Sequence, residues 1–264
     1  MNTPLRRLFL ASLLGAAPAC VHHTDFSKTP TPEGTALLRE VDQLESYTER
    51  VKGSARVSVQ ATEGSGETGA FIAAQAPGEA HLELLDFFGS PSQVLVSDGR
   101  VFGLYQKDKG TYLTGPATAA AISRLLPIHL SPEDLVAILL GRTPRLAVPP
   151  FSVEPDAEAD AWRVTLVQAD RRQTLWIHPV SRRVVRSVLE GPGGYELLFD
   201  QVKTADGIPF ARKVTFKDSA ATVVLRWSPE DVELDPKLDP ALFRVAAPPG
   251  ARVVEVDGRG PGAG

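Results

Sequence analysis

Among the 264 residues are five histidines and one cysteine, the side chains best suited to metal, acid–base or nucleophilic chemistry. His22 and His23 are adjacent, but no further ligand lies near them in the sequence, so they do not predict a metal site. His81, His129 and His178 fall in separate predicted strands or loops, with no Asp or Cys at a suitable spacing. No G-x-S-x-G, H-E-x-x-H or P-loop motif is present. The sequence therefore predicts no catalytic residue, no metal site, no cofactor and no enzymatic activity, and a hydrolase without these motifs is the less favoured alternative.

The position of Cys20 in the sequence indicates a chemical role for this residue. It follows two basic residues, Arg6 and Arg7, and an apolar run over 8–14 that is too short to span a bilayer, a pattern typical of an export signal. A lone cysteine cannot form an internal disulfide. The run Ala17-Pro18-Ala19-Cys20 instead resembles a bacterial lipobox, with Ala17 where Leu is usual. We therefore expect a signal peptide over 1–19 and a lipid on Cys20; the alternative is cleavage near Ala19 that leaves a free thiol.

Composition limits the partners of the mature chain. A formal net charge of −4 and a pI of about 5.8 leave no strongly basic face, so nucleic acid is not an expected partner. The polar, proline-rich segment that starts at Val21 predicts a flexible tether, so that 20–34 forms the lipidated N-terminus and tether. One domain over 35–256 follows, and the glycine-rich 257–264 predicts a disordered tail.

The hydrophobic pattern of this domain indicates a mainly β protein with a few helices. Apolar residues at helical spacing predict a helix from Leu37 to Val51. An alanine-rich helix is expected over 116–126, and Ser131 is expected to cap another that Gly141 ends. Short alternating runs predict antiparallel strands without βαβ spacing. The predicted strands are 55–61, 68–75, 82–85, 94–96, 101–105, 111–113, 162–167, 174–178, 184–189, 195–200, 210–216 and 222–227.

The loop between the third and fourth predicted strands has an unusual composition. Phe87 and Phe88 stand before Gly89, where small polar residues are the norm. Successive residues of a strand point to opposite sides, so one ring is expected in the core and the other in solvent, available to a membrane or acyl chain. The alternative is that both rings lie in the core.

The predicted strand around Trp176 is apolar on both faces, because Trp176 alternates with Leu175 and Ile177. A sheet that is apolar on both faces needs a cover on each face or a cavity on one.

The order of these elements resembles the LolB family of outer-membrane lipoprotein receptors, within the LolA/LolB superfamily. The segment 82–90 is similar to that family's strand and protruding loop, and 126–142 to its helix–turn–helix insertion. Segments 175–179 and 242–245 are similar to the related periplasmic carrier LolA. The resemblance implies a mainly β (α+β) fold: a strongly curved antiparallel sheet, an incomplete barrel, with about three short helices capping its concave face. It also implies an acyl-chain cavity between sheet and helices, and selects Phe88 as the exposed ring.

The sequence thus predicts a lipid-anchored protein that faces the periplasm from the outer membrane, since Val21 rather than Asp follows Cys20 and this resembles Gram-negative sorting rules. It would be a monomer that accepts lipidated proteins or lipids, from a LolA-like carrier among other donors, and passes them to the membrane. An envelope scaffold of the same fold with a filled interior is the alternative. The residues expected to line the cavity are Val57, Val59, Phe71, Leu82, Leu84, Leu95, Phe102, Leu135, Leu139 and Trp176.

Overall fold

The computed structural model describes residues 24–62, 64–124, 127–205 and 207–257. Three α-helices and one 3₁₀-helix lie within these ranges: α1 (Gly34–Glu45), α2 (Ala119–Ile122), α3 (Pro132–Leu139) and η1 (Pro240–Phe243). The strands are β1 (Arg50–Ala61), β2 (Gly64–Gln75), β3 (Glu79–Leu85), β4 (Pro91–Asp98), β5 (Val101–Gln106), β6 (Thr111–Pro116), β7 (Pro150–Asp156), β8 (Ala161–Gln168), β9 (Arg171–Ile177), β10 (Val184–Glu190), β11 (Tyr195–Ala205), β12 (Ile208–Lys217), β13 (Ala221–Trp227), β14 (Glu233–Leu234) and β15 (Arg252–Glu255). The predicted strands are therefore confirmed.

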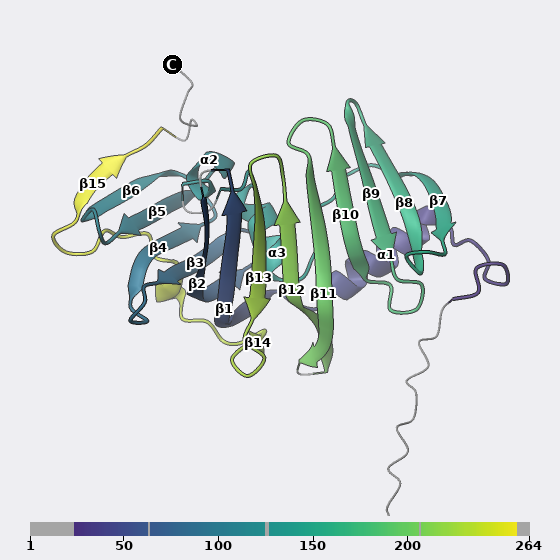
Figure 1. Cartoon of the computed structure of the whole chain (residues 1–264), viewed down its shortest axis with the longest axis horizontal. Helices are drawn as coiled ribbons and strands as arrows, with labels where there is room; N and C mark the ends of the chain where they lie inside the picture. Colours follow the sequence, from purple (N-terminus) through teal and green to yellow (C-terminus); the bar gives the residue numbers. More distant parts are fainter. Residues whose placement is uncertain (1–23, 63, 125–126, 206, 258–264) are drawn as a thin grey trace, which may run out of the picture.

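The described strands form a single curved sheet that does not close (Figure 1). Its order is β15-β6-β5-β4-β3-β2-β1-β13-β12-β11-β10-β9-β8-β7, with β14 paired to β1. Pairing is antiparallel except between β15 and β6. Two meanders, β1–β6 and β7–β13, are joined where β1 pairs with β13. The predicted incomplete barrel is confirmed.

Helices α1 and α3 lie on the same side of this sheet, α1 across the half that ends in β7 and α3 across the centre (Figure 1). They create two apolar cores. The larger core joins α3 to β1–β5 and β11–β13. In the smaller core, Leu37 and Val41 of α1 pack against Trp162, Leu166 and other side chains of β8–β10.

Several predicted boundaries were wrong. The first helix ends at Glu45 instead of extending to Val51, because Val51 is fully buried in β1, where it pairs with Ala74 and Leu234. The helix expected over 116–126 is reduced, in its described part, to the four residues of α2. Two stretches outside the predicted strands also join the sheet: β7 forms before the predicted strand 162–167, and β2 begins at Gly64 instead of at 68.

The segment expected to be a tether contacts the domain in its described part. The ring of Phe26 packs edge-on against Trp162 at 4.9 Å between centroids. The backbone N–H of Thr24 donates to the Asp160 carboxylate at 2.9 Å. Cys20 and the predicted signal peptide lie outside the described residues.

Polar contacts fix the chain where it passes from the larger core to the smaller. The Arg142 guanidinium donates from Nε and Nη2 to the carbonyl of Thr48, at 3.1 and 2.6 Å. The next backbone N–H, of Thr143, donates to Glu45 Oε1 at 3.2 Å. Burial raises the pKa of the Glu45 carboxyl from its usual 4.5 to about 7, and the Thr143 hydrogen bond only partly opposes this.

Glu45→Gln should therefore change how the stability depends on pH. Because the pKa is raised in the folded state, the protonated Glu45 carboxyl is favoured there. Its contribution to the free energy of unfolding is complete below about pH 4.5 and is lost as the pH rises through about 7. Gln cannot ionise but can still accept from Thr143. The variant should exceed the wild type in free energy of unfolding by about 1–3 kcal/mol at pH 8 and by much less at pH 5, where most of the carboxyl is still protonated in the folded state. Urea unfolding at both values measures this, with Glu49→Gln at an exposed position as the control. A difference between variant and wild type that is the same at pH 5 and pH 8 would contradict the assignment.

Candidate functional site

The candidate site is formed by α3 and the concave face beneath it. Ser131 caps α3: its hydroxyl accepts from the backbone N–H of Asp134 at 3.0 Å, and Pro132 occupies the first turn. Gly141, at φ 73°, follows the last turn in the left-handed conformation that glycine adopts without strain. The expected start and end of this helix are confirmed. Because both ends are fixed by local contacts, the helix is well defined although it has only eight residues.

A cavity of about 50 Å³ lies between α3 and the sheet. All twelve lining side chains are apolar: Val57, Ile72, Leu82, Ile128, Leu130, Leu135, Ile138, Leu139, Val214, Phe216, Val223 and Leu225. Among the described residues, no charged or hydrogen-bonding side chain reaches the cavity wall, so apolar groups would be favoured inside. Its volume is well below the roughly 300–1,000 Å³ of typical ligand sites.

Most of the predicted cavity residues lie on this face. Val57, Leu82, Leu135 and Leu139 line the cavity itself. Four others belong to the same core without lining the cavity: Val59, Leu84, Leu95 and Phe102.

Phe71 and Trp176 do not line the cavity: Phe71 points to the opposite face of the sheet, and Trp176 lies on β9, whose inward side chains belong to the smaller core beneath α1. The neighbour of Phe71 in β2, Ile72, faces α3, while the Phe71 ring lies 6.1 Å from that of His81. Trp176 donates from Nε1 to Asp156 Oδ2 at 2.9 Å, and the Arg186 guanidinium covers its ring at 4.5 Å. The prediction placed both residues in the cavity because an alternating strand does not reveal which face is concave.

The far wall of the cavity was missed. Val214 and Phe216 of β12 and Val223 and Leu225 of β13 provide it. The two residues of each pair are two positions apart, so the sequence does show that they share one face of their strand. Only the pairing of β13 with β1 places these side chains opposite those of β1–β3.

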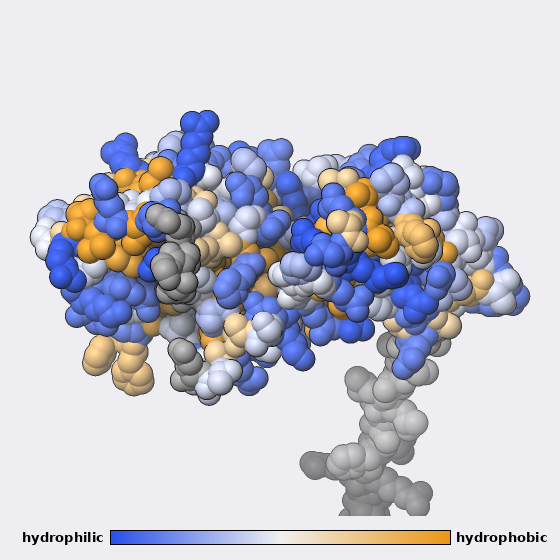
Figure 2. Space-filling view, turned by 90° about the horizontal axis from the view of Figure 1, so that it is seen from above, coloured by the Kyte–Doolittle hydropathy of each residue, from blue (hydrophilic) through white to orange (hydrophobic). Residues whose placement is uncertain are grey.

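The β3–β4 loop projects from the molecule with both aromatic rings in solvent. Phe87 is 97 % exposed and Phe88 is 88 % exposed, and the rings contact each other at 5.5 Å between centroids. Hydrophobic side chains project from the left end of the space-filling view, the end where Figure 1 places β3 and β4 (Figure 2). The expectation of an exposed Phe88 is met, whereas the expectation that the other ring serves the core was wrong.

Asp86 holds this loop in shape. Its Oδ1 accepts from the backbone N–H groups of Phe88 and Ser90, both at 2.9 Å. The Ser90 hydrogen bond is the main reason that the pKa of Asp86 is lowered. Gly89, at φ 77°, completes the turn. The rings are therefore presented by an ordered turn, because its backbone hydrogen bonds are satisfied locally.

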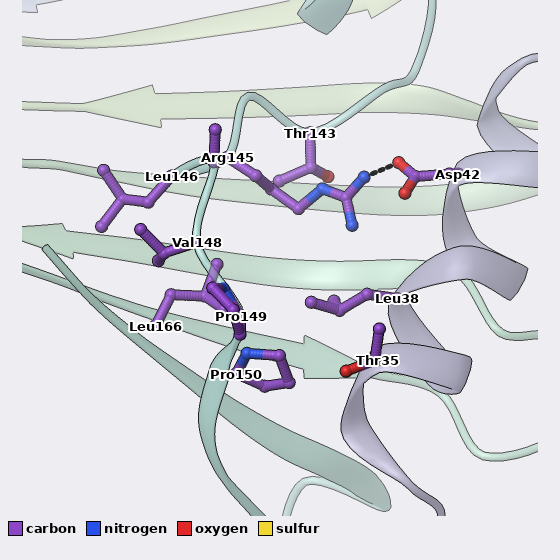
Figure 3. Close-up of a pocket in the computed structure, with 11 residues that line it drawn as sticks. Thr35, Leu38, Asp42, Thr143, Arg145, Leu146, Val148, Pro149, Pro150 and Leu166 are labelled. Atoms are coloured by element: carbon purple, nitrogen blue, oxygen red, sulfur yellow. Dashed lines mark hydrogen bonds and ion pairs between the residues drawn. The ribbon is translucent and has the colours of Figure 1, made fainter.

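A second, larger cavity of about 560 Å³ lies between α1 and the chain segment 143–150 (Figure 3). Leu38 of α1 points across it toward Val148 and Pro150, and Leu166 of β8 forms its floor (Figure 3). An ion pair between Arg145 and Asp42 crosses one end. This cavity belongs to the smaller core and is separate from the one beneath α3.

The described residues contain no group of three or more His, Cys, Asp or Glu side chains placed to share a metal ion. Within the same ranges, no helix has the length and apolar character that a membrane crossing requires.

Comparison with solved structures identifies the fold. A LolA superfamily protein from Nitrosomonas europaea matches over 81 % of this chain and 98 % of its own, with a TM-score of 0.56 and 12 % identity. A Vibrio parahaemolyticus domain with a suggested role in outer membrane lipoprotein sorting matches over 80 % and 95 %, with a TM-score of 0.56 and 11 % identity. A DUF1329 family protein from Desulfovibrio piger matches equally broadly, over 80 % and 95 %, with a TM-score of 0.55 and 14 % identity.

No family model and no curated protein sequence matches the chain. The structural matches nevertheless extend over nearly the whole of each compared protein. The protein therefore has a LolA/LolB-like fold.

The exposure of the β3–β4 loop yields a stability test. Phe88→Glu should change the free energy of unfolding by no more than about 0.5 kcal/mol, because the side chain contacts little besides Phe87. Leu82→Glu, on the adjoining strand and 3 % exposed, should cost several kcal/mol because it buries a charge. Thermal and urea unfolding of both variants measure the difference. Comparable losses in the two variants would mean that the Phe88 ring is buried in solution.

Proposed function

We propose that this protein is a lipid-anchored outer-membrane protein that accepts the acyl chains of lipidated proteins or lipids and transfers them to the membrane. The observation that carries the proposal is the cavity beneath α3, whose walls are wholly apolar. Such a wall excludes charged or strongly polar substrates and favours hydrocarbon, roughly in proportion to the apolar area that leaves water.

Helix α3 has to move for an acyl chain to enter, since the cavity of about 50 Å³ is too small for one. The helix is short, and its inward side chains Leu135, Ile138 and Leu139 contact the sheet by apolar packing alone. Such contacts are not directional, so hydrocarbon from a ligand can replace them at little cost. Transfer is then passive: cargo moves according to its affinity for each successive apolar site, without nucleotide, metal or catalytic step.

The exposed rings of Phe87 and Phe88 supply the contact with the receiving bilayer. Moving a Phe side chain into an apolar phase is worth about 1.5–3 kcal/mol, enough to orient the loop toward a membrane but insufficient to anchor the protein. Stable attachment is assigned to the lipid on Cys20. Val21 after that cysteine supports retention at the outer membrane, where the protein would work as a monomer and receive cargo from a periplasmic LolA-like carrier.

A scaffold role is the second candidate. It is favoured by the same small volume, because a cavity of about 50 Å³ approaches a filled interior. The two functions differ in one respect: a carrier opens beneath α3 in the presence of hydrocarbon, and a scaffold does not.

A photoreactive fatty-acyl probe should therefore label the wild type at residues beneath α3, including Leu139 and Leu225. Leu84→Glu, at the half-buried edge of the same core, should weaken probe binding about tenfold or more by placing a charge beside the hydrocarbon. Fluorescence titration and mass spectrometry of the labelled peptides measure both effects.

Phe71→Glu is the matched control, since Phe71 is also half-buried but lies on the opposite face, and its probe affinity should equal that of the wild type. Absence of labelling beneath α3 in the folded wild type would reject the carrier function and favour the scaffold.

The β3–β4 loop should contribute to the delivery of an acyl chain to the membrane and not to the binding of that chain by the protein. Phe87→Glu/Phe88→Glu should bind the acyl probe as the wild type does but transfer it to liposomes several-fold more slowly, because the loop no longer enters the bilayer. Stopped-flow transfer between labelled protein and vesicles measures the rate.

Phe151→Glu provides the control, since Phe151 is 74 % exposed but lies on the edge strand β7. Equal transfer rates for the double variant and this control would remove the loop from the mechanism.

A further inference from the structure

A third cavity, of about 180 Å³, is lined mainly by polar groups. It lies where the segment 144–147 passes over the ends of β8, β9 and β11, and its polar residues include Gln168, Arg171, Gln173 and Tyr195. No function proposed above uses it. Its volume is several times the roughly 30 Å³ that one water molecule occupies, so it has room for a larger polar group.

Arg171 carries a charge in this cavity that the described residues leave without a partner. Its Nε is buried and makes no hydrogen bond, and the guanidinium forms no ion pair with any described acidic side chain. Arg145, the other arginine of the cavity, is different because it pairs with Asp42. Arg171 is a half-buried side chain, but its buried and unsatisfied Nε donor is costly, and an anion placed against the guanidinium would satisfy that donor and pair with the charge.

Side chains next to Arg171 provide further hydrogen-bond donors for the oxygen atoms of an anion. Burial, followed by the charge of Asp134, raises the pKa of Tyr195 well above its usual range, so its hydroxyl remains a proton donor at neutral pH. That hydroxyl is 3.5 Å from the carbonyl of Pro144, a long contact that a better acceptor can replace. Gln173 is already occupied: it accepts from Leu146 N–H and donates to Pro144 and Ser187. It therefore forms a fixed wall and leaves Arg171, Tyr195 and the exposed amide of Gln168 as donors, of which only Arg171 is charged.

We propose that this cavity binds a phosphate group, held by the Arg171 guanidinium and the Tyr195 hydroxyl. Arginine presents planar, paired donors that suit phosphate oxygens, and such charge-assisted hydrogen bonds are among the stronger ones. Asp134, in the first turn of α3, opposes the binding because its carboxylate faces the same cavity. Replacement of Asp134 should therefore raise the affinity, and replacement of Arg171 should lower it.

The phosphate can be free or part of an amphiphile, and the adjoining cleft distinguishes the two. The cavity of about 560 Å³ beside α1 shares Arg145, Leu146 and Ala147 with the phosphate site. Its walls are largely apolar, with Leu38, Val148 and Leu166 exposed to it. A phosphate carrying a hydrocarbon tail could bury that tail in this cleft. The site lies outside the α3 cavity and goes beyond the function proposed above.

The test uses inorganic phosphate and decyl phosphate, kept below its micelle concentration, titrated into the wild-type protein by calorimetry. Binding of both should weaken about tenfold or more in Arg171→Gln and strengthen in Asp134→Asn. Arg172→Gln, at the exposed neighbouring position, should leave binding unchanged. Amide NMR spectra should show shifts at Gln168, Arg171 and Tyr195. Thermal melts establish that each variant is folded.

A bound amphiphile is indicated if decyl phosphate binds more tightly than phosphate and loses that advantage in Leu38→Gln; equal affinities indicate a free anion. The proposal is overturned if neither ligand binds, or if binding is the same in folded Arg171→Gln. Decyl phosphate that binds independently of Arg171 and shifts only the amides around Ile138 and Leu139 would overturn this site while supporting the α3 cavity.

Discussion

The pairing of β1 with β13 is the contact on which the structure depends. It runs in register from Ala55↔Trp227 to Ala61↔Ala221 and joins two meanders that are otherwise separate in the sheet order. One wall of the α3 cavity comes from β1–β3 and the other from β12 and β13. The cavity therefore exists only where these hydrogen bonds hold, although the paired residues are more than 150 positions apart in the sequence. Contacts of such separation cost more loop-closure entropy than the local hairpin contacts within each meander.

An open curved sheet leaves a broad concave face that has to be shielded from water. This chain covers it with separate pieces, α3 over the larger core and α1 over the smaller one. The connection between them is polar and closely hydrogen-bonded: Arg142 to Thr48, Thr143 to Glu45, and Leu146 to the buried amide of Gln173. The two cores therefore meet at a polar boundary that Tyr195 spans, since its ring packs against both, and the polar cavity around Arg171 lies at this boundary.

The apolar groups of the protein occur in two different settings. The cavity beneath α3 is apolar and narrow, whereas Phe87 and Phe88 are almost fully exposed on a turn held by Asp86. Exposed aromatic pairs are unfavourable in water and are retained where a partner surface compensates for them. The pair is fixed by backbone hydrogen bonds to a carboxylate, so the rings stay exposed instead of folding back on the sheet. In the proposed function, the α3 cavity would hold hydrocarbon and the β3–β4 loop would contact the membrane, so the two tasks fall to different parts of the molecule.

The sequence by itself determined the local features of this protein. Ser131 and Gly141 bound α3, and two-residue alternation locates the strands, because capping and strand periodicity depend on neighbouring residues alone. Tertiary structure decided the rest. Val51 is a strand residue because it pairs on both sides. Phe71 points away from the cavity because the other face of β2 is the concave one, and Trp176 is remote from it because β9 lies in the half of the sheet that α1 covers. β15 was not predicted, since a short exposed segment becomes a strand only by pairing with the edge of β6. The volume beneath α3 and the unpaired Arg171 depend on packing between distant segments, which no local pattern of residues encodes.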